Sequence, residues 1–211
     1  MQDPNKTPVN DPLRIPISAS VRHVHLSETH LSLLFGPGSK LTPRSDLSQP
    51  GQFACEEVVT LVGPRGQIPR VRVLGPCRLQ TQVEISRTDE FILGLDAPIR
   101  ASGNIDGTPG VTLQGPAGQV DLAHGLIQAQ RHIHMSPEDA ARFGVQDKQW
   151  VMVRVGGERG VIYDDVLVRV HQDYRLDMHL DTDEANAANL QPGSTGHIIK
   201  NLAAVQPEPN D

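Results

Sequence analysis

The sequence has little of three things that mark common protein classes: aromatic residues, cysteine and lysine. Its 211 residues include one Trp, two Tyr and four Phe. The two cysteines are too few for a framework of disulfide bonds, so we expect a protein of the reducing cytoplasm. The net charge is −6 and the chain has no lysine-rich run, which argues against a general nucleic-acid binder.

The sequence also lacks a long apolar segment. No window approaches the roughly 20 apolar residues that a membrane-spanning helix needs, so we expect no membrane partner. Residues 1–10 have no apolar core of a secretion signal. We therefore expect residues 1–14 to be a disordered lead-in and residues 203–211 to be a tail.

Glycine and proline, in contrast, are frequent. The chain has 19 Gly and 17 Pro, which is typical of short strands joined by turns. We expect strands at residues 15–24, 57–62, 69–74 (ending at Gly75 and Pro76), 81–86, 150–155 and 161–170, and two more within 111–122. Short strands at this spacing predict a mainly β protein with closed or nearly closed barrels.

Two short segments of the chain nearly repeat each other, and each carries a pair of histidines. One pair is His23 and His25, and the other is His132 and His134. In both, an arginine precedes the pair, a β-branched residue separates its members and a serine follows two positions later. Side chains two positions apart project from the same face of a strand, so each pair would place two imidazoles side by side.

A short helix that ends at a glycine is predicted after each histidine pair. In the second copy, Ser136 is a favourable N-cap, Pro137 takes the first helical position and Gly144 ends the helix. In the first copy, a leucine-rich segment ends at Gly36. Because strand, histidine pair, helix and glycine recur in this order, we predict two β-barrel domains related by internal duplication, each capped by short α-helices.

Two imidazoles side by side are suited to binding a metal ion. A catalytic zinc ion usually has three protein ligands and one open position, so two pairs would need further ligands. His179, which has acidic residues nearby, and Glu84, within an expected strand, can supply them. An acid such as Glu84 more commonly points outward to water, and a single histidine pair is more commonly an exposed strand pair. We favour metal binding because the pattern occurs twice.

A polar run at residues 75–89 contains Arg78, six positions before Glu84. A cation beside a metal-bound acid would suit an anionic substrate and would stabilise charge on an acyl oxygen. An arginine that pairs with Glu84 or Asp89 on the surface of a strand is an equal alternative. Nothing in the sequence places a base beside Cys77, so we expect a small buried residue there and not a nucleophile.

Together, these segments resemble the phosphate propanoyltransferases of the PduL type, a class of phosphotransacylase. The resemblance spans about residues 15–202 and rests on residues 20–27, 75–76 with 78–89, 131–136 and 178–187, in that order. It implies two β-barrel domains with the active site between them, which we assign to residues 15–127 and 128–202. In this family the first strand can belong to the second barrel.

The resemblance also implies the site residues. Two divalent metal ions, normally zinc, would be held by His23, His25, Glu84, His132, His134 and His179. Arg78 would contact the phosphate substrate, and Ser102, in a polar loop similar to one near this site, is a further candidate for substrate binding.

The activity that the resemblance implies is reversible transfer of a short acyl group, propanoyl or acetyl, between coenzyme A and inorganic phosphate. Metal and arginine would stabilise the oxyanion while phosphate attacks directly, with no acyl group on Cys77. Two alternatives stay open from the residues alone. One is a dinuclear metallohydrolase of a thioester or phosphoester, and the other is a non-catalytic tandem-barrel binding module held by structural metals.

The expected partners are acyl-CoA and CoA, phosphate and acyl phosphate. Members of the family form dimers or larger assemblies, so the resemblance also implies a homo-oligomer. Many members reside in bacterial microcompartments and carry an amphipathic N-terminal targeting helix. Residues 1–10 have no such pattern, so we expect a bacterial cytoplasmic location.

Overall fold

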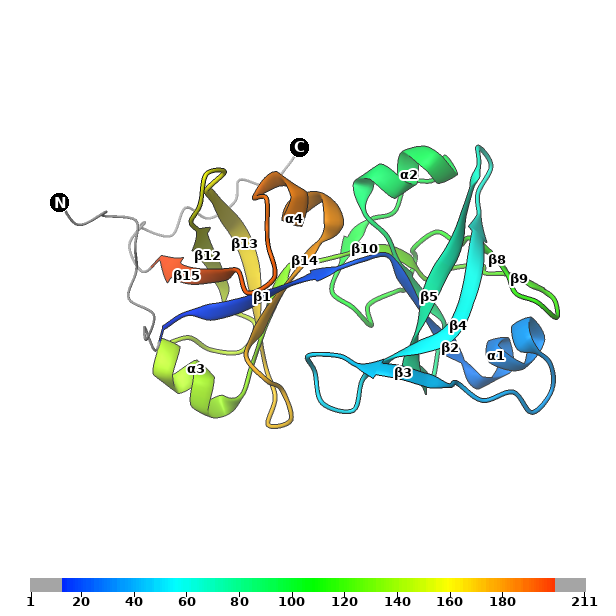
Figure 1. The fold of residues 1–211 in the computed structure, drawn as a ribbon, viewed down its shortest axis with the longest axis horizontal. Helices are drawn as coiled ribbons and strands as arrows, with labels where there is room; N and C mark the ends of the chain where they lie inside the picture. The colour runs from blue at the N-terminus through cyan, green and yellow to red at the C-terminus, as the bar shows by residue number, and fades with distance from the viewer. Residues whose placement is uncertain (1–12, 200–211) are drawn as a thin grey trace.

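The computed structural model describes residues 13–199, which form two β-sheets and four short helices (Figure 1). Residues 1–12 of the expected lead-in and the whole of the expected tail lie outside the described residues. Within the described range, no helix is long and apolar enough to cross a bilayer.

One sheet closes on itself as a barrel. Its six strands, in order, are β1 (Ile15–Ser20), β14 (Asp177–Asp181), β11 (His132–Met135), β13 (Val161–Val170), β12 (Trp150–Val155) and β15 (Thr195–Ile199). Fully buried side chains from several of these strands, Ile15, Ile133, Val153 and Val168 among them, fill its interior. The closed barrel expected for the second half of the chain is therefore confirmed.

The other sheet has nine strands and stays open, as a half-barrel. Its order is β7 (Ile99–Arg100), β10 (Leu126–Ala129), β6 (Gln82–Glu84), β2 (His23–Ser27), β5 (Gln67–Arg78), β4 (Phe53–Val62), β8 (Thr112–Gln114) and β9 (Gln119–Asp121), with β3 (Pro43–Asp46) beside β4. The expectation of two closed or nearly closed barrels is therefore confirmed only in part, because this sheet is a half-barrel. In the described part of the chain, β8 pairs onward with β9 and β10 pairs onward with β7, which leaves the two ends of the sheet unjoined.

Six strands of the open sheet have the same order and relative directions as the six strands of the barrel. Along the order β10–β6–β2–β5–β4–β8, the successive pairs are parallel, antiparallel, parallel, antiparallel and antiparallel. Along the order β1–β14–β11–β13–β12–β15, the successive pairs have the same series of directions. The correspondence agrees with an internal duplication, which itself stays a prediction.

Residues 15–24, which were expected as one strand, form parts of two strands in different sheets. β1 pairs with β14 and β15 in the barrel, whereas β2 pairs with β5 and β6 in the open sheet. The chain crosses from one sheet to the other at Val21 and Arg22 (Figure 1). The division of the chain at residues 127 and 128 stays a prediction, although β1 lies in the barrel of the later residues.

β5 was expected to end at Gly75 and Pro76, but it continues to Arg78. The Gly75–Pro76 peptide bond is cis. A Cβ on Gly75 would overlap the ring of Phe53, so any larger residue at this position requires that ring to move. The extension of the strand brings Arg78 opposite Ser27 of β2, close to the histidine pair.

The four helices are α1 (Glu28–Phe35), α2 (Arg87–Leu93), α3 (Pro137–Phe143) and α4 (Thr182–Ala187). Each begins shortly after a strand that carries candidate site residues. The side chains of Ser27, Ser136 and Asp181 cap three of them by accepting a backbone N–H, a contact worth about 1 kcal/mol. The helices expected after the histidine pairs are confirmed, whereas α2 and α4 were not predicted.

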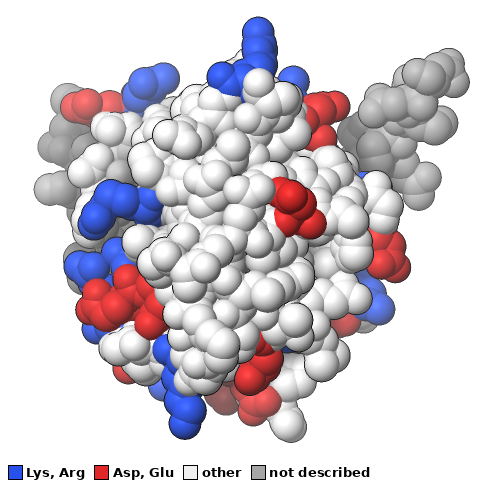
Figure 2. Space-filling model, turned by 90° about the vertical axis from the view of Figure 1, so that its right-hand side faces the viewer, with Lys and Arg blue, Asp and Glu red and all other residues white. Residues whose placement is uncertain are grey.

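The open sheet and α1 form one end of the molecule (Figure 1). Lysine and arginine side chains lie around the edge of this end, interspersed with acidic ones, and a broad uncharged area occupies its middle (Figure 2). Charge of one sign therefore does not gather on this face.

Candidate active site

The six candidate ligand residues come from four strands and form two groups of three. The open sheet contributes His23 and His25 from β2 and Glu84 from β6, and the barrel contributes His132 and His134 from β11 and His179 from β14. Within each group, the candidate ligand atoms all lie within 4.8 Å of one another. Three ligand-type side chains at such distances match a catalytic metal site that keeps an open position.

Strand register explains why each group converges. β2 and β6 run antiparallel with His23 opposite Glu84, and β11 and β14 run antiparallel with His132 opposite His179. Directly opposed side chains on one face of a sheet lie about 5 Å apart. The second histidine of each pair, two positions later, shares that face.

In the open-sheet group, a buried carboxylate faces buried imidazoles. His23 donates from Nδ1 to the carbonyl of Val21 over 2.8 Å, and its Nε2 lies 3.4 Å from Oε2 of Glu84. Burial alone would raise the pKa of Glu84, but His23, His25 and Ser102 together hold this pKa well below its ordinary value. Burial and then His23 lower the pKa of His25 far below its ordinary value.

In the barrel group, His132 is held in the same way as His23 is in the open-sheet group. His132 donates from Nδ1 to the carbonyl of Gln130 over 2.7 Å, again two residues back, and its Nε2 lies 3.0 Å from Nε2 of His134. Burial lowers the pKa of His132 to about 4 and that of His134 to about 2. Neutral imidazoles at neutral pH are the form that binds metal ions.

Two buried ring nitrogens without a hydrogen-bond partner bear on whether these groups could bind a metal ion. Nδ1 of His25 and Nδ1 of His134 have no hydrogen-bond partner among the described residues. A buried polar group without a partner costs about 1–3 kcal/mol. A metal ion bound through these Nδ1 atoms would offset that cost, so the residues present fit such an ion.

His179 is held by polar side chains around it. Its Nε2 lies 3.1 Å from Oδ2 of Asp177 and 3.2 Å from the hydroxyl of Ser48. Asp177 is buried and also accepts a hydrogen bond of 2.7 Å from Ser18. The acidic residue near His179 in the sequence therefore orients the ring, while Ser48 was missed because it comes from a distant loop.

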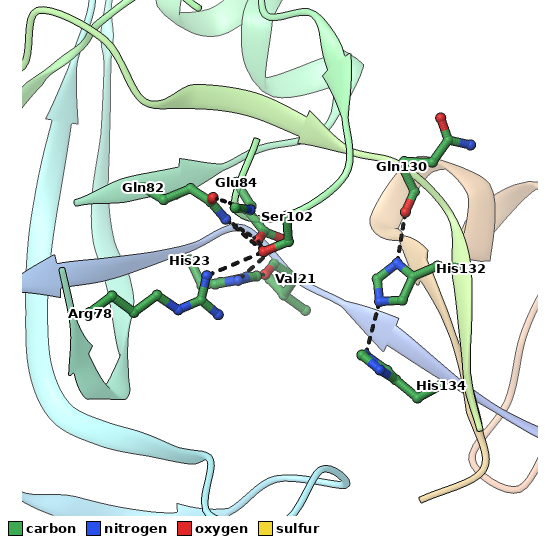
Figure 3. A network of polar contacts seen from close by, with 10 residues as sticks. Val21, His23, Arg78, Gln82, Glu84, Ser102, Gln130, His132 and His134 are labelled. Atoms are coloured by element: carbon green, nitrogen blue, oxygen red, sulfur yellow. Dashed lines mark hydrogen bonds and ion pairs between the residues drawn. The ribbon is translucent and has the colours of Figure 1, made fainter. Parts of the chain in front are cut away.

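Both groups line a single cleft of about 670 Å³ between the two sheets. Figure 3 shows His23 and Glu84 on one side and His132 and His134 on the other. Arg78 and Ser102 line the same cleft, and Arg78 donates to the Ser102 hydroxyl over 3.2 Å. Arg78 forms no ion pair with Glu84 or Asp89 among the described residues, because Asp89 pairs with Arg22 at 2.8 Å instead. The cleft therefore has a guanidinium group that no carboxylate neutralises by direct contact.

Other residues of the cleft were not predicted from the sequence. Arg169 of β13 lies opposite His134 in the sheet register, and its side chain reaches the Tyr174 hydroxyl at 3.5 Å. Gln82 does not line the cleft, but it contacts Glu84 and Ser102, which do. Its position two residues before Glu84 could have pointed to it, because both side chains share one face of β6. For Arg169 and Tyr174 the sequence offered no comparable signal.

Cys77 does not line the cleft, although it precedes Arg78 directly. It is partly buried against the core of the open sheet, and burial raises the pKa of its thiol. Both observations agree with a packing role rather than a nucleophilic one.

Comparison with known proteins gives a match over most of the chain. Residues 16–191 match the family model of phosphate propanoyltransferases. The phosphate propanoyltransferase of Thermotoga maritima is 54% identical over 88% of this chain and 89% of its own length. The proteins of the same name from Enterococcus faecalis and Sebaldella termitidis are 53% and 52% identical, each over 87% of this chain and 87% of their own lengths.

Proposed function

The chain belongs to the phosphate propanoyltransferase family, an enzyme family, and on this premise we propose that its cleft catalyses reversible transfer of a short acyl group between coenzyme A and inorganic phosphate. The observation that carries the proposal is the meeting of the two ligand groups and Arg78, which forms no ion pair among the described residues, in a single cleft. The expected homo-oligomer and the expected cytoplasmic location stay predictions.

Each group of three ligands would hold one divalent metal ion. Zinc is the first candidate because imidazole and carboxylate ligands with an open position are typical of catalytic zinc. When bound, such ions supply Lewis acidity that polarises a carbonyl or phosphoryl oxygen. Structural zinc sites have four protein ligands, so groups of three argue against a non-catalytic binding module.

Arg78 binds the phosphate substrate in this proposal. A guanidinium group presents paired N–H donors that match phosphate oxygens, and its charge offsets theirs. Held in this way, phosphate is positioned for attack on the thioester carbonyl, which removes much of the entropic cost of the encounter. Ser102, which accepts from Arg78, orients the guanidinium group toward the cleft.

The proposed reaction is a direct transfer that needs no acyl-enzyme intermediate. An oxygen of hydrogen phosphate forms a bond to the thioester carbonyl carbon, and the carbon–sulfur bond breaks. The products are the acyl phosphate and coenzyme A, and the proton of hydrogen phosphate leaves on the coenzyme A thiol. Burial lowers the pKa values of His25, His132 and His134 and so keeps these rings neutral, while His23, His25 and Ser102 hold the pKa of Glu84 below its ordinary value. Both charge states suit cation binding.

The test is the release of thiol from propanoyl-CoA and acetyl-CoA with and without phosphate. We expect release to depend on phosphate and to yield acyl phosphate. Replacing Arg78→Ala should raise KM for phosphate and lower kcat/KM by about 100-fold or more, since two charge-assisted hydrogen bonds of about 1.5–3 kcal/mol each are lost. Arg154→Ala, at an exposed position of β12, is the matched control.

Thiol release at the same rate without phosphate would favour the metallohydrolase instead. An Arg78→Ala enzyme with an unchanged KM for phosphate would contradict the role of Arg78. Ping-pong kinetics or an acyl group trapped on Cys77 would contradict direct attack.

A further inference from the structure

Glu84 shares a closed triangle of hydrogen bonds with Gln82 and Ser102 at the cleft (Figure 3). The amide nitrogen of Gln82 lies 2.6 Å from Oε1 of Glu84 and 2.8 Å from the hydroxyl of Ser102. That hydroxyl donates to the same Oε1 over 2.8 Å. One oxygen of the buried carboxylate therefore accepts from two neutral donors.

The chemistry of the partners fixes the orientation of the Gln82 amide. A carboxylate only accepts, so the NH₂ end of the amide must face Glu84. The carbonyl end accepts from the backbone N–H of Gly103 over 2.8 Å, which the opposite orientation would forbid. Gln82 is 2% exposed, so its hydrogen bonds have no competition from bulk water.

The two oxygens of Glu84 have different surroundings. Oε1 is held by Gln82 and Ser102, whereas Oε2 faces Nε2 of His23 at 3.4 Å. We propose that Gln82 and Ser102 are positioning residues that occupy Oε1 and so reserve Oε2 of Glu84 for the metal ion of the open-sheet group. This inference rests on the proposed function, because it requires that ion.

Ser102 has a second contact that Gln82 lacks. Its hydroxyl accepts from Arg78 at 3.2 Å as well as from Gln82, and it donates to Glu84. One donor and two acceptor positions are the full capacity of a hydroxyl group. Ser102 therefore links the residue proposed to bind phosphate to the residue proposed to bind metal, while Gln82 contacts Glu84 and Ser102 and reaches Arg78 only through Ser102.

The experiment measures zinc retention by the purified, zinc-loaded protein against increasing chelator, with a zinc count per chain at each step. In Gln82→Leu, the affinity for one of the two zinc ions should fall about 10–100-fold, so less chelator should remove this ion than in wild type. Such a loss is the usual effect of removing a supporting contact. The second ion, in the barrel group, should be retained as in wild type and serves as an internal control. Gln80→Leu, exposed and two positions earlier, is the matched control.

Ser102 gives a second readout. Ser102→Ala should lose the same zinc ion early and, when assayed with excess zinc, should also show a raised KM for phosphate. Gln82→Leu with excess zinc should raise the KM for phosphate less than Ser102→Ala does, because Gln82 itself does not contact Arg78. Ser102→Thr, which keeps the hydroxyl group, should restore both properties toward wild type.

Several results would overturn the inference. One is a Gln82→Leu protein that holds both ions as tightly as Gln80→Leu does, a result that leaves the proposed function intact. Another is simultaneous loss of both ions, which would mark a general disturbance of the fold. A wild-type protein that binds no metal would overturn the inference together with the metal centre. If Gln82→Leu does not fold by circular dichroism, zinc retention by Ser102→Ala decides, and a wild-type result there overturns the inference.

Discussion

The metal-free protein should lose stability in mild acid because of His132. This ring is 7% exposed, its Nδ1 is bound to a carbonyl and its Nε2 lies 3.0 Å from a ring nitrogen of His134. A proton on Nε2 would therefore point at a neighbouring histidine in a buried place. Burial first, and His179 second, lower the pKa of His132 to about 4.

The sign and size follow from proton linkage. An unfolded histidine takes up a proton below about pH 6.5, whereas folded His132 does so only below about pH 4. Stability is therefore unaffected above pH 6.5, falls as the pH drops from 6.5 to 4, and is fully reduced below 4. At pH 5 the loss from this residue is about 2 kcal/mol relative to pH 7, and the full loss is about 3 kcal/mol.

The assay is urea unfolding in the presence of a chelator at pH 7, 6 and 5. The comparison is between wild type and His132→Asn, with the exposed His124→Asn as the control. Between pH 7 and 5, wild type and His124→Asn should lose about 2 kcal/mol more than His132→Asn does. Equal losses in all three proteins would refute a buried neutral ring at His132.

Two further predictions concern the support of the site. Asp177→Asn should weaken zinc retention by the barrel group about 10–100-fold, because Asp177 orients His179. The control in the same chelator titration is Asp173→Asn, at an exposed position, and equal retention by both proteins would contradict this prediction. Gly75→Ala should lower the free energy of unfolding by about 1–3 kcal/mol, because the added methyl group would meet Phe53. Gly156→Ala, where the methyl group would have open space, should leave it unchanged. Urea unfolding measures both, and equal stability of the two variants would contradict the predicted overlap with Phe53.

Local signals in the sequence predicted the parts of the site that depend on one strand. The period of two placed His23 beside His25 and His132 beside His134. Caps and glycines predicted the helices after both pairs. The capping patterns that begin α2 and α4 were present as well, at Ser86 with Asp89 and at Asp181 with Glu184, but they were not used.

Non-local pairing decided what the sequence could not. The alternation of residues 15–24 runs on through the crossing at Val21, so only the partners of β1 and β2 show that two sheets are involved. The closure of a barrel likewise depends on which strands meet at its ends. Register between strands sets Glu84 opposite His23, with 8% of Glu84 exposed. The sequence made Glu84 a candidate ligand but could not decide its orientation, because an acid within a strand more commonly points to water.

The most direct measurement of the central claim is anomalous diffraction at the zinc absorption edge from crystals of the zinc-loaded protein. The account predicts two peaks in one cleft, one among His23, His25 and Glu84 and the other among His132, His134 and His179. Absence of peaks, or peaks only at other positions, would contradict it.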